Sequence, residues 1–123
     1  MFVEDLARTK AFYRDVLEYS LVHEDENSVV FNPDHLSLNL LKVSAAAELV
    51  EPAKVGGPDA GARFVLTIGV DDVDAAVSQL AKRGVELLNG PMNRRWGIRT
   101  ASFTDPSGHI WEMAGPIPQA EAS

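Results

Sequence analysis

The sequence predicts an α+β fold built from two tandem β-α-β-β-β modules, whose strands form a cupped mixed sheet with the helices on its outer face. Three observations support this: the same order of elements occurs twice, short motifs recur at matching places, and one side of each expected strand is apolar. We expect the 123 residues to form a single domain. Its parts are module one at 1–43, a linker at 44–61, module two at 62–116 and a tail at 117–123.

Two segments have the spacing of amphipathic helices. Apolar residues recur every three or four positions in 5–17 and again in 72–83. Asp5 is the expected N-cap of the first helix, and either Asp71 or Asp72 takes that place in the second.

Short extended segments flank each helix. The expected strands are 1–3, 21–24, 28–31 and 36–43 in module one, and 64–70, 85–88, 96–104 and 109–114 in module two. The last strand of each module follows a turn, which Asn32 and Pro33 start in module one and Asp105 and Pro106 start in module two.

Alternation along these strands separates a face covered by helices from an open face. The covered face is expected to hold Leu36, Leu38, Leu40, Phe64, Leu66, Ile68, Val70, Ala101, Phe103, His109, Trp111 and Met113. The open face is more polar, and a curved sheet with such a face forms a ligand cleft. The predicted ligand-binding residues are Asn39, Thr67, Trp96, Thr100, Ser102 and Glu112.

Charge and composition exclude several classes of function. Eleven Lys and Arg against 18 Asp and Glu give a formal net charge of -7, which argues against nucleic acid and favours cationic or neutral ligands. The absence of Cys excludes disulfides, thiolate nucleophiles and Cys-based zinc sites. No apolar run has the length of a membrane span, and charged residues interrupt the start where a signal peptide would lie. We therefore expect a cytoplasmic protein that binds neither membranes nor nucleic acids.

Motifs along nearly the whole chain are similar to those of a known superfamily. They are FVEDL at 2–6, FYRDVL at 12–17, VDDVDAA at 70–76 and FTDPSGHIWE at 103–112. In this order they resemble the vicinal oxygen chelate superfamily, which includes glyoxalase I, bleomycin-resistance proteins, extradiol dioxygenases and fosfomycin-resistance thiol transferases. The resemblance implies the paired modules described above. It also implies a divalent metal that chelates two adjacent substrate oxygens as a Lewis acid.

The resemblance places the metal ligands on the first and last strands of each module, and this chain fills few of those positions. Glu112 stands at the position on the last strand of module two, whereas the matching residue in module one is Asn39, a poor ligand. The position on the first strand of module two falls on Val65, and that of module one falls before Met1. A first strand that begins upstream, with a His or Glu, would give two ligands. We expect no metal cofactor; under the alternative, the ligand types suit Mn, Fe, Ni or Zn.

Glu112 and Trp96 each have two interpretations. Glu112 is either a general base or ligand contact, or a residue paired with an Arg. Trp96 either stacks on an aromatic or cationic ligand, or lies at the rim of a dimer contact. The nearby Arg94 and Arg95 belong to a polar loop that either grips an anionic group or is simply solvated.

The remaining candidates favour structural roles. We expect a structural or surface role for each of the three histidines, His23, His35 and His109. We expect Arg99 to form an ion pair with a nearby Asp, and Tyr13 to pack in the core.

These observations favour a small-molecule-binding protein of the glyoxalase/bleomycin-resistance type with an incomplete metal site. Its ligand is expected to be cationic or aromatic, and the chain is expected to form a homodimer that completes two clefts. The alternative is a metal-dependent lyase, dioxygenase or thiol transferase of the same superfamily. A third class is a structural dimer or accessory subunit.

Overall fold

The chain folds as two compact units. The computed structural model describes residues 1–34 and 36–119. Unit 1 comprises Met1–Gly61 together with Asp105–His109, and unit 2 comprises Ala62–Thr104 and the chain from Ile110 onward. The assignment of Asp105–His109 to unit 1 was not predicted from the sequence.

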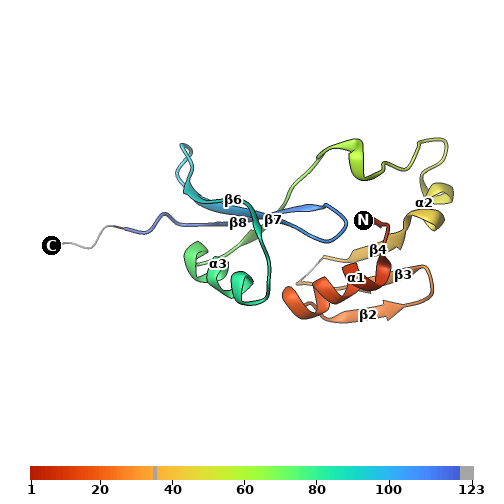
Figure 1. Ribbon diagram of the computed structural model, residues 1–123, viewed down its shortest axis with the longest axis horizontal. Helices are drawn as coiled ribbons and strands as arrows, with labels where there is room; N and C mark the ends of the chain where they lie inside the picture. The colour runs from red at the N-terminus through yellow and green to blue at the C-terminus, as the bar shows by residue number, and fades with distance from the viewer. Residues whose placement is uncertain (35, 120–123) are drawn as a thin grey trace. The chain divides into compact units, whose positions relative to one another are not determined.

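Each unit carries one four-stranded mixed sheet (Figure 1). Unit 1 contains β1 (Phe2–Val3), α1 (Leu6–Ala11), the π-helical turn η1 (Phe12–Val16), β2 (Leu21–Glu24), β3 (Ser28–Phe31), β4 (Leu38–Lys42), α2 (Val43–Val50) and the 3₁₀ turn η2 (Pro58–Ala60). Unit 2 contains β5 (Leu66–Gly69), α3 (Val73–Lys82), β6 (Leu87–Asn93), β7 (Arg99–Thr104) and β8 (Ile110–Gly115). The α+β class and the repeated β-α-β-β-β order are confirmed.

The two sheets have the same topology. Their strand orders are β1-β4-β3-β2 and β5-β8-β7-β6. In each unit the first strand pairs in parallel with the last, and the other pairings are antiparallel. The strand before each helix therefore lies directly beside the final strand of its module.

Capping aspartates fix the starts of the helices. The Asp5 carboxylate accepts a hydrogen bond from the Arg8 N–H at 3.0 Å, and the Asp72 carboxylate accepts one from the Ala75 N–H at 3.0 Å. Asp72 rather than Asp71 is thus the cap of α3. Helix α1 packs on β3 and β4, and α3 packs on β6, β7 and β8 (Figure 1). One face of each sheet is covered by a helix.

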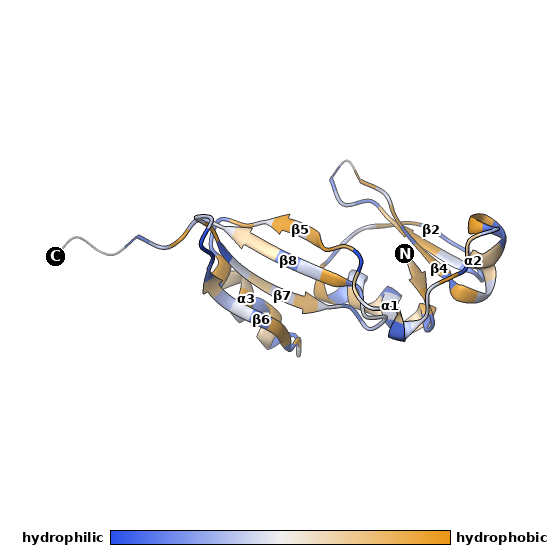
Figure 2. Cartoon of the chain, turned by 90° about the horizontal axis from the view of Figure 1, so that it is seen from above, coloured by the Kyte–Doolittle hydropathy of each residue, from blue (hydrophilic) through white to orange (hydrophobic). Residues whose placement is uncertain are grey.

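At the centres of the strands, the buried residues are those that the alternation predicts. At the strand ends, observed and predicted burial differ. Leu38, Leu40, Ala101, Phe103, Trp111 and Met113 are all buried, and hydrophobic stretches follow the strands in Figure 2. The predictions for Leu36 and Phe64 are wrong: both side chains are about half exposed, because each residue precedes its strand. Leu36 lies in a turn, where its N–H donates to the Pro33 carbonyl at 3.0 Å.

The open face is only partly open. Asn39 and Thr67 are exposed, as predicted, but Thr100 and Ser102 are buried. Both lie on β7, an inner strand between β6 and β8, and the Arg94 side chain covers Thr100 with a hydrogen bond to its hydroxyl.

The segment at 44–61 is more ordered than a plain linker. The eight-residue helix α2 (Val43–Val50) occupies the start of this segment. Among residues 1–34 and 36–119, no helix has the length and apolarity needed to cross a membrane.

Candidate functional site

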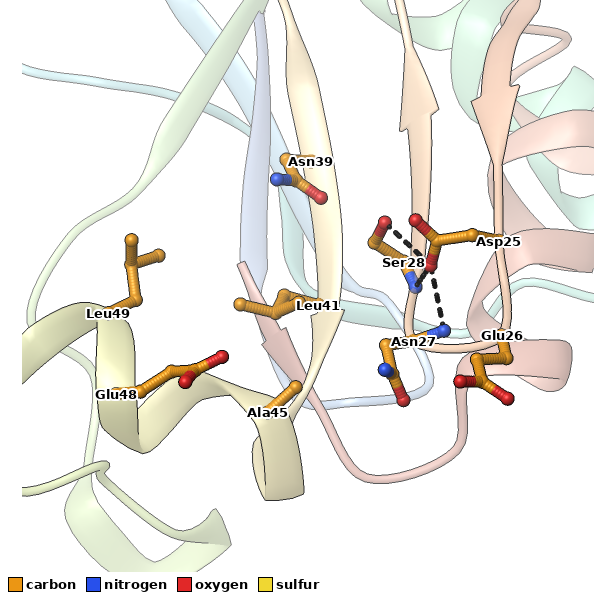
Figure 3. Close-up of a pocket in the computed structure, with 9 residues that line it drawn as sticks. All are labelled: Asp25, Glu26, Asn27, Ser28, Asn39, Leu41, Ala45, Glu48 and Leu49. Atoms are coloured by element: carbon orange, nitrogen blue, oxygen red, sulfur yellow. Dashed lines mark hydrogen bonds between the residues drawn. The ribbon is translucent and has the colours of Figure 1, made fainter.

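Unit 1 contains a cavity of about 740 Å³ (Figure 3). The β2–β3 turn, the outward face of β4 and one side of α2 line it, and it is open to solvent. Its lining residues are Asp25, Glu26, Asn27, Ser28, Asn39, Leu41, Ala45, Glu48 and Leu49. The cavity therefore includes Asn39, one of the predicted ligand-binding residues.

The charged residues of this cavity are all acidic. Its lining has three carboxylates, those of Asp25, Glu26 and Glu48, and no Lys, Arg or His. The side-chain carboxylates of Glu26 and Glu48 form no hydrogen bond or ion pair with another residue that the structure describes. In Figure 3 the Glu48 carboxylate points from α2 toward Leu41. Two carboxylates are therefore available to a ligand.

Asp25 has a different role, because it holds the β2–β3 turn. Its Oδ1 accepts hydrogen bonds from the Asn27 N–H at 2.8 Å, the Ser28 N–H at 2.9 Å and the Ser28 hydroxyl at 3.1 Å. The Asn27 N–H, followed by His23, lowers the pKa of this carboxyl. Asp25 thus adds a fixed negative charge to the cavity wall.

An apolar surface faces these carboxylates. Leu49 is 67% exposed on α2, and the half-buried Leu41 lies on β4. A solvent-exposed Leu beside free carboxylates favours a ligand that carries both a positive charge and an apolar part.

A second group of predicted residues meets on the sheet of unit 2. Thr67 on β5 lies opposite Glu112 on β8, and its hydroxyl donates to Glu112 Oε1 at 3.3 Å. Ser102 on β7 lies opposite Glu112 on the other side. The structure therefore brings Thr67, Ser102 and Glu112 together on three neighbouring strands, with the Thr67 hydroxyl bound to the Glu112 carboxylate.

This donor set does not fit a divalent metal. Glu112 is flanked by neutral hydroxyls, and Val65 supplies no donor atom. No group of three or more His, Asp or Glu side chains in the described parts of the chain is arranged to hold a metal ion. A single carboxylate does not compete with water for such an ion.

The other predicted residues lie elsewhere. Thr100 accepts a hydrogen bond from Arg94 Nε at 2.8 Å, so its hydroxyl is already engaged. Trp96 lies in the β6–β7 turn and is 58% exposed, with the guanidinium carbons of Arg94 and Arg95 at 5.8 and 5.6 Å from its ring centroid. Asn39 belongs to the cavity of unit 1.

The acidic residues of the cavity were not predicted from the sequence. Asp25, Glu26 and Glu48 form no motif, because the turn and the helix that carry them meet only in the folded unit. The Asp25-Glu26-Asn27-Ser28 turn has a detectable signal, since Asp commonly accepts backbone hydrogen bonds two and three residues ahead. Nothing local indicates that α2 lies beside it.

A buried polar network organises the rest of unit 1. Tyr13 donates its hydroxyl hydrogen to Asp105 Oδ2 at 2.7 Å, and His109 Nδ1 lies 2.7 Å from the same oxygen. Asp105 Oδ1 accepts from the N–H groups of Ser107 and His109. Burial opposes ionisation of this carboxyl, but the hydrogen bonds from His109 and Tyr13 outweigh it and lower the pKa of Asp105.

The expected structural roles are found for several residues. His109 belongs to the network around Asp105, Tyr13 is fully buried, and Arg99 forms an ion pair with Asp74 at 3.0 Å. His23 lies on the surface and contacts Asp25 at 3.3 Å. His35 lies outside the described residues.

Comparisons with known proteins agree with the fold. A family model described as the Glyoxalase/Bleomycin resistance protein/Dioxygenase superfamily matches residues 1–113. An uncharacterized protein, YraH, from Bacillus subtilis (strain 168) is 30% identical over 117 residues, which cover 92% of this chain and 91% of that protein.

Two solved structures show the same fold at lower identity. A glyoxalase/bleomycin resistance protein/dioxygenase from Nocardioides has a TM-score of 0.83 and 23% identity, covering 100% of this chain and 83% of that one. A lactoylglutathione lyase from Agrobacterium tumefaciens has a TM-score of 0.75 and 21% identity, covering 94% and 88%.

Proposed function

Because this chain belongs to the Glyoxalase/Bleomycin resistance protein/Dioxygenase superfamily, we propose that it binds a small molecule with a positive charge and an apolar or aromatic part. The observation that carries the proposal is the cavity of unit 1, where three carboxylates and no basic side chain face exposed Leu49 and half-buried Leu41.

The charge of the ligand follows from the carboxylates that the fold leaves unused. Asp25 is engaged by the turn, whereas Glu26 and Glu48 have no partner among the described residues. A hydrogen bond to a charged group contributes about 1.5–3 kcal/mol. At an exposed site, solvent screening reduces that value. The net charge of -7 also raises the local concentration of cations.

The Glu112 group is the second part of the proposal. In unit 2, Glu112, with Thr67 and Ser102 beside it, acts as a ligand contact or as a general base at a site of its own. Asn39 provides a neutral amide in the cavity. We also propose that the chain acts as a homodimer.

The test is calorimetric titration of the full chain with benzamidine, a planar cation, and with benzyl alcohol, its neutral counterpart. Benzamidine is expected to bind more tightly. Glu48→Gln and Glu26→Gln should each lower the affinity for benzamidine about three- to tenfold, which is the scale of one solvent-screened charged hydrogen bond. Glu86→Gln removes the same charge from an exposed position in unit 2 and serves as the control. Equal affinities for the two probes, or equal effects of Glu48→Gln and Glu86→Gln, would contradict the proposal.

Metal analysis separates this function from the alternative of a metal-dependent lyase, dioxygenase or thiol transferase. Stoichiometric Mn, Fe, Ni or Zn in the purified protein, lost in Glu112→Gln, would favour the enzyme. Benzamidine binding to metal-free protein supports the binding function.

A further inference from the structure

The tip of the β6–β7 hairpin carries a charge opposite to that of the unit 1 cavity. We propose that Arg94, Arg95 and Trp96 form a second binding site there, which takes an aromatic ring bearing an anionic group, either a carboxylate or a phosphate. This inference goes beyond the proposed function, because it concerns a different site in unit 2 and the opposite class of ligand.

The backbone of the tip is fixed by hydrogen bonds. The Arg94 N–H donates to the Ile98 carbonyl at 2.7 Å, and the Gly97 N–H donates to the Arg94 carbonyl at 3.0 Å. Gly97 has a φ of +95°, which glycine adopts without the strain that a side chain would cause. The three side chains of the site therefore project from a closed turn, which lowers the entropy lost when a ligand binds.

Arg94 is held in place by neutral partners. Its Nε donates to the buried Thr100 hydroxyl at 2.8 Å and its Nη2 to the Asn89 side-chain oxygen at 3.2 Å. A guanidinium has five N–H donors, so these bonds leave donors over for a ligand. Because both acceptors are uncharged, the positive charge is positioned but not neutralised.

Arg95 and Trp96 complete the site. Arg95 is exposed and forms no hydrogen bond or ion pair with another described residue. Its guanidinium carbon lies 5.6 Å from the centroid of the Trp96 ring, and the guanidinium carbon of Arg94 lies 5.8 Å from the same centroid. Trp96 remains 58% exposed. The tip thus presents two positive charges beside an accessible aromatic surface.

Arg94 and Arg95 differ from two other arginines of the chain, which are paired with carboxylates. Arg99 is paired with Asp74 at 3.0 Å, and Arg14 is paired with Asp15 at 2.7 Å. In a chain with more acidic than basic residues, adjacent Arg94 and Arg95 have no carboxylate partner among the described residues. The planar guanidinium matches the oxygen geometry of carboxylate and phosphate groups.

Tryptophan fluorescence gives a direct readout. Trp111 is 3% exposed, so a ligand at the tip changes mainly the emission of Trp96. The probes are benzoate, phenyl phosphate, acetate and benzamidine, added to the full chain. Benzoate or phenyl phosphate should change the emission at lower concentration than acetate, and benzamidine should not change it. The better of the two anions identifies the preferred group.

Variants locate the site. Arg95→Gln should weaken the better anion about tenfold, the scale of one charge-assisted hydrogen bond, and Trp96→Leu should abolish the fluorescence response. Arg14→Gln removes the same charge from an exposed position in unit 1 and should leave binding unchanged. Arg95 is exposed, so its replacement does not disturb packing.

Three outcomes would overturn the inference: acetate as effective as benzoate and phenyl phosphate, a Trp96→Leu protein that still responds, or equal effects of Arg95→Gln and Arg14→Gln. Glu48→Gln should weaken the binding of benzamidine but not that of the anion. Arg95→Gln should weaken the binding of the anion but not that of benzamidine. Failure of one site is therefore distinguishable from failure of the other.

Discussion

Tyr13 donates a 2.7 Å hydrogen bond to Asp105, 92 residues further along the chain, and both side chains are buried. A buried carboxylate is costly unless its lone pairs are satisfied. Asp105 meets this condition through Tyr13, His109 and two backbone N–H groups. This cluster joins α1–η1 to Asp105–His109 within unit 1.

Removing the Tyr13 hydroxyl should destabilise the protein. Tyr13→Phe keeps the ring but leaves Asp105 without one donor, at an expected cost of about 1.5–3 kcal/mol in urea unfolding. The same change in an Asp105→Asn background should cost less, because the charged acceptor is gone. Strictly additive effects would show that the two groups are not coupled.

Stability should fall at acid pH because of Asp105. Its pKa is lowered in the folded state, so its contribution is fully present above the unfolded value of about 3.9 and is lost as pH falls through the folded value. Urea unfolding between pH 7 and pH 3 should show this loss below about pH 4. The acid loss should be smaller in Asp105→Asn, and an identical profile would contradict the assignment.

Trp111→Ala should cost about 3–5 kcal/mol through cavity formation, because the indole is 3% exposed on the covered face of β8. Trp96→Ala is the matched control, and at 58% exposure it should cost less than about 1 kcal/mol. Denaturant melts of both variants measure the difference. A cost below about 1 kcal/mol for Trp111→Ala would contradict the strand alternation used throughout.

The α3 cap is testable with adjacent residues. Asp72→Ala removes the acceptor for the Ala75 N–H and should cost about 0.5–2 kcal/mol. Asp71→Ala loses the same charge without touching that bond, so its effect on thermal unfolding should be smaller. Equal losses would mean that charge near the helix start, rather than the cap, is responsible.

The proposed homodimer predicts a doubled mass in light scattering at micromolar concentration, with about 1,200–2,000 Å² buried between copies. A monomer at high micromolar concentration would count against it.

Local signals predicted most of the fold. Asp5 and Asp72 cap helices because the acceptor and its N–H lie three residues apart, and the burial of Leu38, Leu40, Trp111 and Met113 follows from alternation on half-covered strands. Strand ends were less predictable: Leu36 continues the alternation but is drawn into a turn by Pro33.

Non-local contacts account for what the sequence did not predict. Thr100 is polar and in the open-face register, yet Arg94 at the tip of the β6–β7 hairpin covers it with a hydrogen bond to its hydroxyl. The acidic cavity depends on α2 lying beside the β2–β3 turn, which no spacing along the chain indicates. By contrast, Thr67 and Glu112 were both expected on the open face, and the pairing of β5 with β8 places them opposite each other.

The late position of residues Asp105–His109 in the sequence affects when unit 1 can complete its contacts during synthesis. Unit 1 includes Met1–Gly61, but two of its contacts depend on residues much later in the sequence. Tyr13 contacts the Asp105 carboxylate, and the Thr9 hydroxyl lies 2.9 Å from the Ser107 hydroxyl. Both partners emerge from the ribosome only after most of unit 2 has been translated. A nascent chain halted after residue 61 would hold α1 and its sheet without these partners. Ribosome-bound or proteolytic fragments of unit 1 should therefore be protease-sensitive until residues 105–109 are available.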